Sequence, residues 1–294
     1  MLDGQTVVIT GASSGIGEAL AVQAARAGGI VILAARRAER LQRITERIRN
    51  AGGKAAFLPC DVTVRSEAEA LIGEAVRLQG KIDVLVNNAG RGNLASIEET
   101  DDDMLHRIFA VNVFALWNTT RPVLRHMRER GRGHIITVAS MAGKLGFPFN
   151  SAYVAAKHAA VGFTHALRAE LAETRIQASV ILPGGVDTDF NRVTEGGSME
   201  EFFAAAGPAA RRIAGERELP RVPVEGVLPP DRIAAKILEC IEHPAAEWYT
   251  HQGSAEFAAL AARDREESER FQRAGVLGEA EAYGLVKGKR GVRP

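Results

Sequence analysis

The sequence predicts an α/β fold in which one doubly wound parallel sheet is covered by helices on both faces. Short apolar runs alternate with longer amphipathic stretches over the first 183 residues. The runs are rich in Val, Ile and Leu and do not alternate with polar residues, which is typical of parallel strands that are buried on both faces. Regular strand–helix succession predicts right-handed βαβ units. The 294 residues, 46% of them hydrophobic, are compatible with one large domain.

The predicted elements follow one another along the chain. The strands are 6–10, 30–35, 55–59, 82–87, 134–139 and 178–183, and the helices are 17–27, 37–51, 66–79, 101–130 and 151–174. After Pro183 this order breaks, because residues 188–230 contain several glycines and prolines. Long loops in compact domains are usually functional or disordered. We interpret 188–230 as a mobile insertion with short helical pieces that forms a lid over the substrate.

The C-terminal part resumes regular structure. We expect a helix at 231–242, a short strand at 247–250 and a helix at 255–273, and we expect the basic segment 284–294 to fray. The chain is therefore divided into a domain of residues 1–250, which includes the insertion 188–230, and a helical extension of residues 251–294.

Composition excludes several classes of protein. The net charge is +1, from 37 basic and 36 acidic residues, so nothing indicates a nucleic-acid or membrane partner. Cys60 and Cys240 match neither a disulfide framework nor a zinc motif. We expect both thiols to be reduced and buried, and we predict no metal site. The apolar run 7–9 is too short for a signal core, so a soluble cytoplasmic protein is expected.

A glycine-rich turn points to a nucleotide. Gly11, Gly15 and Gly17 follow a predicted strand and open a predicted helix. Without side chains, the backbone can turn tightly and approach a pyrophosphate, which the helix N-terminus attracts. This context favours a Rossmann-type dinucleotide site, although glycines that serve only the turn remain an alternative.

The end of the second strand favours NADP over NAD. An NAD site usually places an acid there to bind the ribose hydroxyls. Here the strand ends at Ala35, and Arg36 and Arg37 follow. Guanidinium groups bind phosphate by charge and by paired hydrogen bonds. The alternative is that both arginines simply begin an exposed helix.

Tyr153 and Lys157 indicate proton transfer. Their i,i+4 spacing places them on one face of a helix. A phenol has a pKa near 10, and a nearby ammonium lowers it. Lowering the pKa by about 3 units requires roughly 4 kcal/mol. Ser140 ends the fifth predicted strand, where its hydroxyl can hold a substrate carbonyl oxygen.

The pair by itself is weak evidence. Tyr283 and Lys287 have the same spacing, but glycines at 278, 284 and 288 predict a poor helix there, and no strand-terminal serine precedes them. We interpret Tyr283 and Lys287 as a coincidence. Seen alone, Tyr153 and Lys157 would be a core tyrosine and a surface lysine, so their meaning depends on the other motifs.

Taken together, the motifs resemble the short-chain dehydrogenase/reductase family, in its shorter single-domain branch. The resemblance covers about residues 4–190, and more loosely extends to about residue 250. The matching segments are Thr10-Gly11-Ala12-Ser13-Ser14-Gly15-Ile16-Gly17, Asp61-Val62, Asn87-Asn88-Ala89-Gly90, Asn112, Ser140, Tyr153-Val154-Ala155-Ala156-Lys157 and Pro183-Gly184. Several motifs in this order are specific for the family but not for a substrate.

This resemblance implies roles for individual residues. Tyr153 would be the general acid or base, Lys157 would lower its pKa and bind the nicotinamide ribose, and Ser140 would orient the substrate oxygen. Asn112 would support a proton relay. Cofactor contacts would come from Thr10, Gly11, Ser13, Ser14, Gly15, Ile16, Gly17, Asp61, Val62, Asn87, Ala89, Gly90, Pro183, Gly184, Val186 and Thr188, besides Arg36, Arg37, Tyr153 and Lys157. Outside this context, Asn112 could be a helix-interior hydrogen bonder and Asp61 a cap. Asn88 is expected to stabilise the strand ends.

The expected activity is NADP-dependent interconversion of a carbonyl and a secondary alcohol. A catalytically silent NADP-sensing regulator is the alternative. A sugar-nucleotide epimerase or dehydratase normally needs a larger C-terminal domain than this chain offers. By the resemblance, helices near 101–128 and 151–174 would form a homodimer or homotetramer. Phe147, Phe149, Phe190, Phe202 and Phe203 fit either an apolar lid over a lipophilic substrate or ordinary packing.

Overall fold

The computed structural model describes residues 2–191 and 194–288. Its centre is a seven-stranded parallel sheet with the order β3-β2-β1-β4-β5-β6-β7. The strands are β1 (Thr6–Thr10), β2 (Ile30–Ala35), β3 (Lys54–Pro59), β4 (Val84–Asn87), β5 (Gly133–Val138), β6 (Ile176–Leu182) and β7 (Glu247–Tyr249). Each lies within a few residues of a predicted strand. The strand order reverses between β1 and β4, and ligands of open α/β sheets bind at the carboxyl edge beside such a point.

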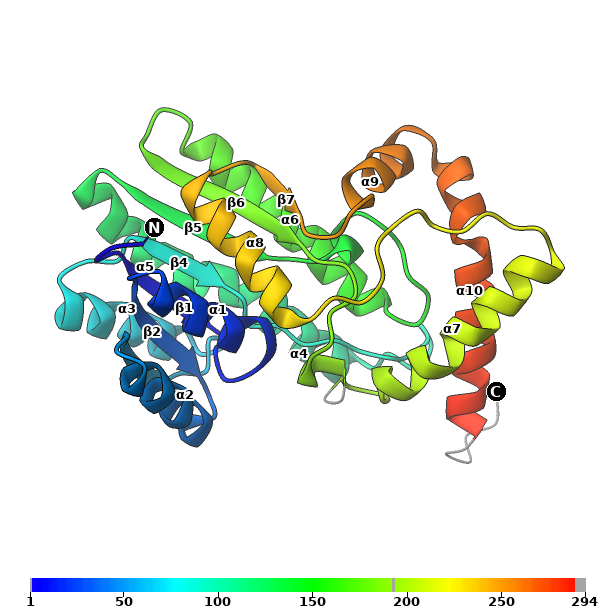
Figure 1. The fold of residues 1–294 in the computed structure, drawn as a ribbon, viewed down its shortest axis with the longest axis horizontal. Coiled ribbons are helices and arrows are strands. Elements are labelled where there is room, and N and C mark those ends of the chain that lie inside the picture. Colours follow the sequence, from blue (N-terminus) through cyan, green and yellow to red (C-terminus); the bar gives the residue numbers. More distant parts are fainter. Residues whose placement is uncertain (1, 192–193, 289–294) are drawn as a thin grey trace.

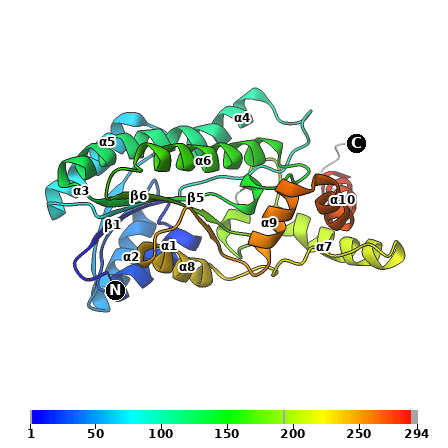
Figure 2. The same cartoon turned by 90° about the horizontal axis from the view of Figure 1, so that it is seen from above.

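Helices cover both faces of the sheet, so the predicted fold class is confirmed. One layer holds α1 (Gly15–Arg26), α2 (Ala38–Asn50) and α8 (Pro230–Glu242), and the other holds α3 (Arg65–Gln79), α4 (Asp102–Phe109), α5 (Ala115–Arg130) and α6 (Ser151–Glu170), as Figure 2 shows. Val7 and Ile9 of β1 pack into the first layer, whereas Val8 packs into the second. Burial on both faces is why these strands are continuous apolar runs.

The predicted helix 101–130 is interrupted by a wider turn. A π-helical segment, Ala110–Phe114, separates α4 from α5. The side chain of Asp101 caps α4 by accepting a hydrogen bond of 2.7 Å from the backbone N–H of Met104. Such π segments are rare and often lie at functional sites, and this one contains Asn112.

The insertion differs from the prediction of short helical pieces. Its longest element is a single helix of 18 residues, α7 (Met199–Glu216), whose cap Ser198 accepts a hydrogen bond from the N–H of Glu201. In Figure 1, α7 runs beside α10 (Arg265–Gly288) at the end of the molecule farthest from α2. Packing between these two helices stabilises a stretch that looked irregular because Pro208 lies inside it.

The C-terminal region corrects two predictions. The single helix expected at 255–273 is two helices, α9 (Ser254–Arg263) and α10, because Asp264 has an extended backbone and its carboxylate caps α10 at the N–H of Glu267. The poor helix expected around Tyr283 is regular. A Cβ on Gly278 would lie 2.6 Å from the backbone N of Ala210, so this glycine permits close contact between α10 and α7. That packing outweighs a propensity cost of about 1 kcal/mol per glycine.

The two cysteines and the end of the last helix test further predictions from the sequence. Cys60 and Cys240 are buried and unpaired, as predicted. The expected fraying of 284–294 is wrong as far as Gly288, which ends α10, and the remaining six positions lie outside the described residues. Within the described ranges, no helix combines the length and apolar character that crossing a bilayer requires.

Candidate active site

The glycine-rich turn packs closely on the end of β4. Gly11 has a φ of +65°, and a Cβ there would lie 2.8 Å from the Cα of Ala89. A Cβ on Gly17 would lie 2.6 Å from Asn88 Nδ2. Asn88 Nδ2 donates a hydrogen bond of 2.9 Å to the carbonyl of Thr10, which confirms that Asn88 stabilises the strand ends. Glycine is therefore required here to let two backbones meet at the sheet edge.

Two polar side chains beside this turn are satisfied within the protein. The Thr10 hydroxyl accepts hydrogen bonds from the N–H groups of Asn88 and Ala89, at 3.0 and 3.1 Å. Asn87 is buried, and its amide contacts Thr119 and Thr120 of α5. The Asn87 side chain thus faces α5, and only its backbone remains to line a cofactor cleft.

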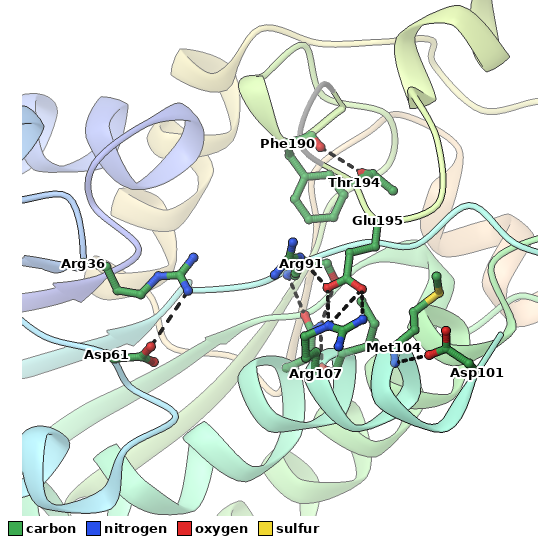
Figure 3. A network of polar contacts seen from close by, with 11 residues as sticks. Arg36, Asp61, Arg91, Asp101, Met104, Arg107, Phe190, Thr194 and Glu195 are labelled. Carbon is green, nitrogen blue, oxygen red and sulfur yellow. Dashed lines mark hydrogen bonds and ion pairs between the residues drawn. The ribbon is translucent and has the colours of Figure 1, made fainter. Parts of the chain in front are cut away.

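The start of α1 fits a phosphate group. No side chain caps this helix, and the hydroxyls of Ser13 and Ser14 each accept a hydrogen bond of 2.8 Å from the guanidinium of Arg37. Uncapped N–H groups at a helix N-terminus bind anions. Arg36, by contrast, is 71% exposed and lies 3.8 Å from the carboxylate of Asp61 (Figure 3). The structure therefore brings Arg37, rather than Arg36, to the turn.

The arginines near this turn form a positive cluster. Burial lowers the pKa of Arg37, and the neighbouring charge of Arg40 lowers it further. Arg40 is itself 2.9 Å from the carboxylate of Asp189. A phosphate bound here would relieve the repulsion among the guanidinium groups. Asp61 also accepts hydrogen bonds from the backbone N–H and the hydroxyl of Thr63, but it does not cap α3, whose N-cap position is Val64.

Three predicted catalytic residues meet at the carboxyl end of β5. Tyr153 and Lys157 lie on α6, and Ser140 follows β5 and hydrogen bonds with Tyr153. Lys157 is 4% exposed; its Nζ donates a 3.1 Å hydrogen bond to the carbonyl of Val138 and lies 5.5 Å from the centre of the Tyr153 ring. This arrangement places a hydroxyl, a phenol and an amine around one point.

Burial dominates the acid–base properties of this pair. It raises the pKa of Tyr153 to about 12, against the opposing effect of the Ser140 hydrogen bond. It also lowers the pKa of Lys157 to about 8. We expected Lys157 to lower the pKa of Tyr153, but burial in the protein raises it. The cause is that the charged forms of both groups lose hydration in the same apolar surroundings.

Asn112 connects the π segment with the loop after β4. Its Nδ2 donates hydrogen bonds to the carbonyls of Arg91 and Ile108, at 2.8 and 2.9 Å. A Cβ on Gly90 would lie 3.0 Å from Asn112 Oδ1 and 3.5 Å from Lys157 Nζ. Asn112 is therefore a helix-interior hydrogen bonder close to Lys157, and the proton relay stays a prediction.

An ion-pair network beside the loop after β4 was not predicted from the sequence. Figure 3 shows Arg91 and Arg107 directed at the carboxylate of Glu195, at 2.9 and 3.0 Å. The Phe190 ring lies 5.7 Å from that of Tyr153, and the carbonyl of Phe190 accepts a hydrogen bond from the hydroxyl of Thr194. No motif marks these residues, because they meet only when the insertion folds over the loop after β4.

His251 holds the predicted cofactor loop after β6. Its buried ring accepts a 3.1 Å hydrogen bond at Nδ1 from the N–H of Gly184, and its Nε2 lies 2.9 Å from the carbonyl of Gly185. A neutral ring with the proton on Nε2 satisfies both contacts. The carbonyl of Pro183 accepts a 2.8 Å hydrogen bond from the N–H of Met141. Sequence spacing could not reveal a partner that is more than 60 residues away.

The remaining residues that were predicted to contact the cofactor lie along the carboxyl edge of the sheet. A Cβ on Gly15 would lie 3.1 Å from the methyl carbon of Thr188. Val186 pairs with Leu228 as an isolated bridge, and Val62 is buried. Ile16 packs against the core under α1. The predicted residues thus lie along one continuous edge of the sheet, which is the arrangement that a dinucleotide requires.

Comparison with known proteins agrees with this geometry. The family model described as short chain dehydrogenase matches residues 5–197. A 3beta-hydroxysteroid dehydrogenase of Mediterraneibacter gnavus is 38% identical over 187 residues, which are 63% of this chain and 67% of that protein. A short chain dehydrogenase/reductase of Burkholderia phymatum in complex with NAD superposes with a TM-score of 0.77 at 27% identity, covering 90% and 95% of the two chains. A variant of the actinorhodin polyketide ketoreductase with NADPH has a TM-score of 0.71 at 30% identity, covering 85% and 97%.

The parallel sheet, the glycine turn at its switch point and the Ser–Tyr–Lys cluster together define a nicotinamide-dependent oxidoreductase. The chain belongs to the short-chain dehydrogenase/reductase family. It is an NAD(P)-dependent enzyme that acts on CH–OH groups.

Proposed function

We propose that this protein interconverts a ketone and a secondary alcohol with NADP as its cofactor. The observation that carries this proposal is the cluster at the end of β5, where Ser140 hydrogen bonds Tyr153 and Lys157 lies 5.5 Å from the centre of the phenol ring. NADP, rather than NAD, is supported by Arg37 at the glycine turn and by the absence of an acid at Ala35. Two of the relatives described above, the 3beta-hydroxysteroid dehydrogenase and the polyketide ketoreductase, have names that indicate reactions of alcohol or carbonyl groups.

The chain's own residues would handle the proton. When bound, the reduced cofactor supplies the hydride for carbonyl reduction. Ser140 holds the substrate oxygen, and Tyr153 donates its phenolic proton to that oxygen as negative charge develops there. Lys157 then stabilises the phenolate until solvent returns the proton. In alcohol oxidation, Tyr153 takes the proton instead.

We propose a lipophilic ketone as the substrate class. The Phe190 ring lies 5.7 Å from that of Tyr153, so an apolar side chain borders the reacting position, and the loop between Ser140 and Tyr153 carries Phe147 and Phe149. A panel of cyclic and acyclic ketones, assayed with both cofactors by nicotinamide absorbance, tests the proposal. Hydride transfer to none of them would instead favour the NADP-sensing regulator.

The pH dependence of the two directions should differ. Oxidation needs the phenolate, and burial raises the pKa of Tyr153 to about 12. Below that pKa the phenolate fraction grows about tenfold per pH unit, so kcat/KM for alcohol oxidation should rise from about pH 6 to about pH 8. Above about pH 8 the rise should level off, because the pKa of Lys157 is lowered to about 8 and the ammonium that stabilises the phenolate is lost. Reduction needs the phenol, which is protonated throughout this range, and the Lys157 ammonium, so its kcat/KM should be nearly flat below about pH 8 and fall above it. Initial rates in both directions provide the measurement, and an oxidation rate that does not change with pH would exclude Tyr153 as the base.

We further propose that part of the insertion 188–230 acts as a lid, within a domain of residues 1–250. Because α7 packs along α10, its amides should be protected from hydrogen exchange without ligand. The stretch 184–190, which carries Thr188 and Phe190, should gain protection when NADPH binds. Exchange measured with and without NADPH tests this, and identical protection of 184–190 in both states would count against a lid.

We also propose that the enzyme is a homodimer or homotetramer that associates through α4, α5 and α6. Phe114 and Trp117, which lie at the junction of the π segment with α5, are 55% and 37% exposed. Large exposed apolar side chains often mark interaction surfaces. Sedimentation of the wild type and of Phe114→Glu measures the association, and a monomeric wild type would refute it.

A further inference from the structure

A second tyrosine–lysine pair, Tyr283 and Lys287 on α10, contacts a segment that borders the candidate site. The hydroxyl of Tyr283 donates a hydrogen bond to the carboxylate of Glu99, and Lys287 Nζ lies 3.1 Å from the same carboxylate. The Tyr283 hydroxyl also accepts a 2.8 Å hydrogen bond from the N–H of Ser96. The pair therefore fastens the C-terminal helix to the segment 93–99 after β4.

The ring of Tyr283 stacks on Phe149. The two ring centres are 3.9 Å apart and the planes differ by 6°, and Phe202 of α7 approaches Phe149 with its ring centre at 6.4 Å. Phe149 has a φ of +60°, a left-handed conformation that an aromatic residue rarely adopts. Such strain persists only where the surroundings hold it, and it tends to occur at functional sites. Tyr283 is one of the groups that hold this conformation.

The same segment also anchors the start of the catalytic helix. The N–H of Ala95 donates a 2.9 Å hydrogen bond to the carbonyl of Phe149. The amide oxygen of Asn93, which is fully buried, accepts a 3.0 Å hydrogen bond from the N–H of Tyr153. A continuous set of contacts thus runs from Tyr283 through 93–99 and Phe149 to the first turn of α6.

We propose that Tyr283 is a positioning residue that shapes the substrate site through Phe149, so that α10 takes part in substrate selection. This inference rests on the proposed function. Phe149 lies in the loop after β5, at the carboxyl edge where open α/β sheets bind substrates. Without the stack, Phe149 can relax to a negative φ and move its ring, which changes the space beside Tyr153. A bulky bicyclic ketone should respond more strongly than a small acyclic one.

The first test compares two substituents at Tyr283. With saturating NADPH, kcat/KM is measured for 2-tetralone and 2-butanone, and the ratio of the two values is followed. Tyr283→Leu should change this ratio about fivefold, as expected for the loss of an aromatic stack. Tyr283→Phe keeps the ring and should restore the ratio to within about twofold of wild type. A purely structural role would lower both values equally and leave the ratio unchanged, which would overturn the proposal.

A double-mutant cycle tests whether Tyr283 acts through Phe149. If it does, Tyr283→Leu should not alter the ratio further in a Phe149→Leu background. Additive effects of the two substitutions would show that Tyr283 does not act through Phe149. Leu285→Ala is the matched control, because Leu285 lies on the same helix and is 55% exposed.

Hydrogen exchange gives a second readout that needs no ketone. In the NADPH complex, amides in 93–99 and 147–150 should exchange faster in Tyr283→Leu than in wild type, and Leu285→Ala should match wild type. Unchanged exchange in Tyr283→Leu would overturn the positioning role. A wild type that binds NADPH but reduces no ketone of the panel would refute the proposed function instead, and the exchange result would still decide whether Tyr283 positions the loop.

Discussion

Replacing Tyr153 by phenylalanine should cut kcat for ketone reduction by about 10²–10⁴-fold, the contribution typical of general acid–base catalysis. The substitution keeps the aromatic ring beside Phe190 and removes only the hydroxyl that hydrogen bonds Ser140. Because the glycine turn is untouched, the Kd for NADPH should stay within about twofold of wild type. Stopped-flow reduction and fluorescence titration with NADPH measure the two quantities.

Tyr249→Phe is the matched control for this prediction. It removes a phenolic hydroxyl from β7, where Tyr249 donates a 2.6 Å hydrogen bond to Glu247. Turnover per bound NADPH should be close to wild type, because this hydroxyl lies outside the Ser140–Tyr153–Lys157 cluster. Equal losses in both variants, or a Tyr153→Phe enzyme with normal turnover, would remove Tyr153 from the chemical step.

The wild-type enzyme should prefer NADP over NAD by at least about tenfold in kcat/KM. A charge-assisted arginine–phosphate contact contributes roughly 1.5–3 kcal/mol, which corresponds to about tenfold to a hundredfold in affinity. Arg37→Ala should lose more of the preference than Arg36→Ala, because Arg37 is at the glycine turn and Arg36 is 71% exposed. The preference should weaken as salt increases, because part of it is coulombic.

Combining Ala35→Asp with Arg37→Ala should reverse the preference. The new carboxylate would repel the 2′-phosphate of NADP and accept from the free 2′-hydroxyl of NAD, while the attraction to phosphate is lost. Arg43→Ala is the control, because it removes an exposed charge from α2, the helix that Arg37 precedes. It should leave the ratio of kcat/KM for NADP to that for NAD unchanged. A wild type that uses both cofactors equally would refute the NADP assignment but not the hydride transfer.

The sheet could be predicted from the sequence, because strands buried on both faces appear as continuous apolar runs. The runs at β1 and β2 match the structure residue for residue, since both faces of each strand are covered and both must be apolar. The glycine turn was also readable, because close backbone approach at Gly11 and Gly17 tolerates no side chain. Ser140, Tyr153 and Lys157 were identified because their roles depend on residue type, spacing and strand position.

The contacts of the C-terminal third with the rest of the protein could be recognised only in the folded chain. Local propensity predicted a poor helix around Tyr283, whereas contact of Gly278 with α7 and the stack on Phe149 make α10 regular. The hydrogen bonds of His251 with the loop after β6 could not be anticipated either. These contacts join segments far apart in the chain, and their energy comes from packing and hydrogen bonds that no local pattern encodes. For the same reason, Tyr283 and Lys287 share the spacing of Tyr153 and Lys157 but meet Glu99 instead of a strand-terminal serine.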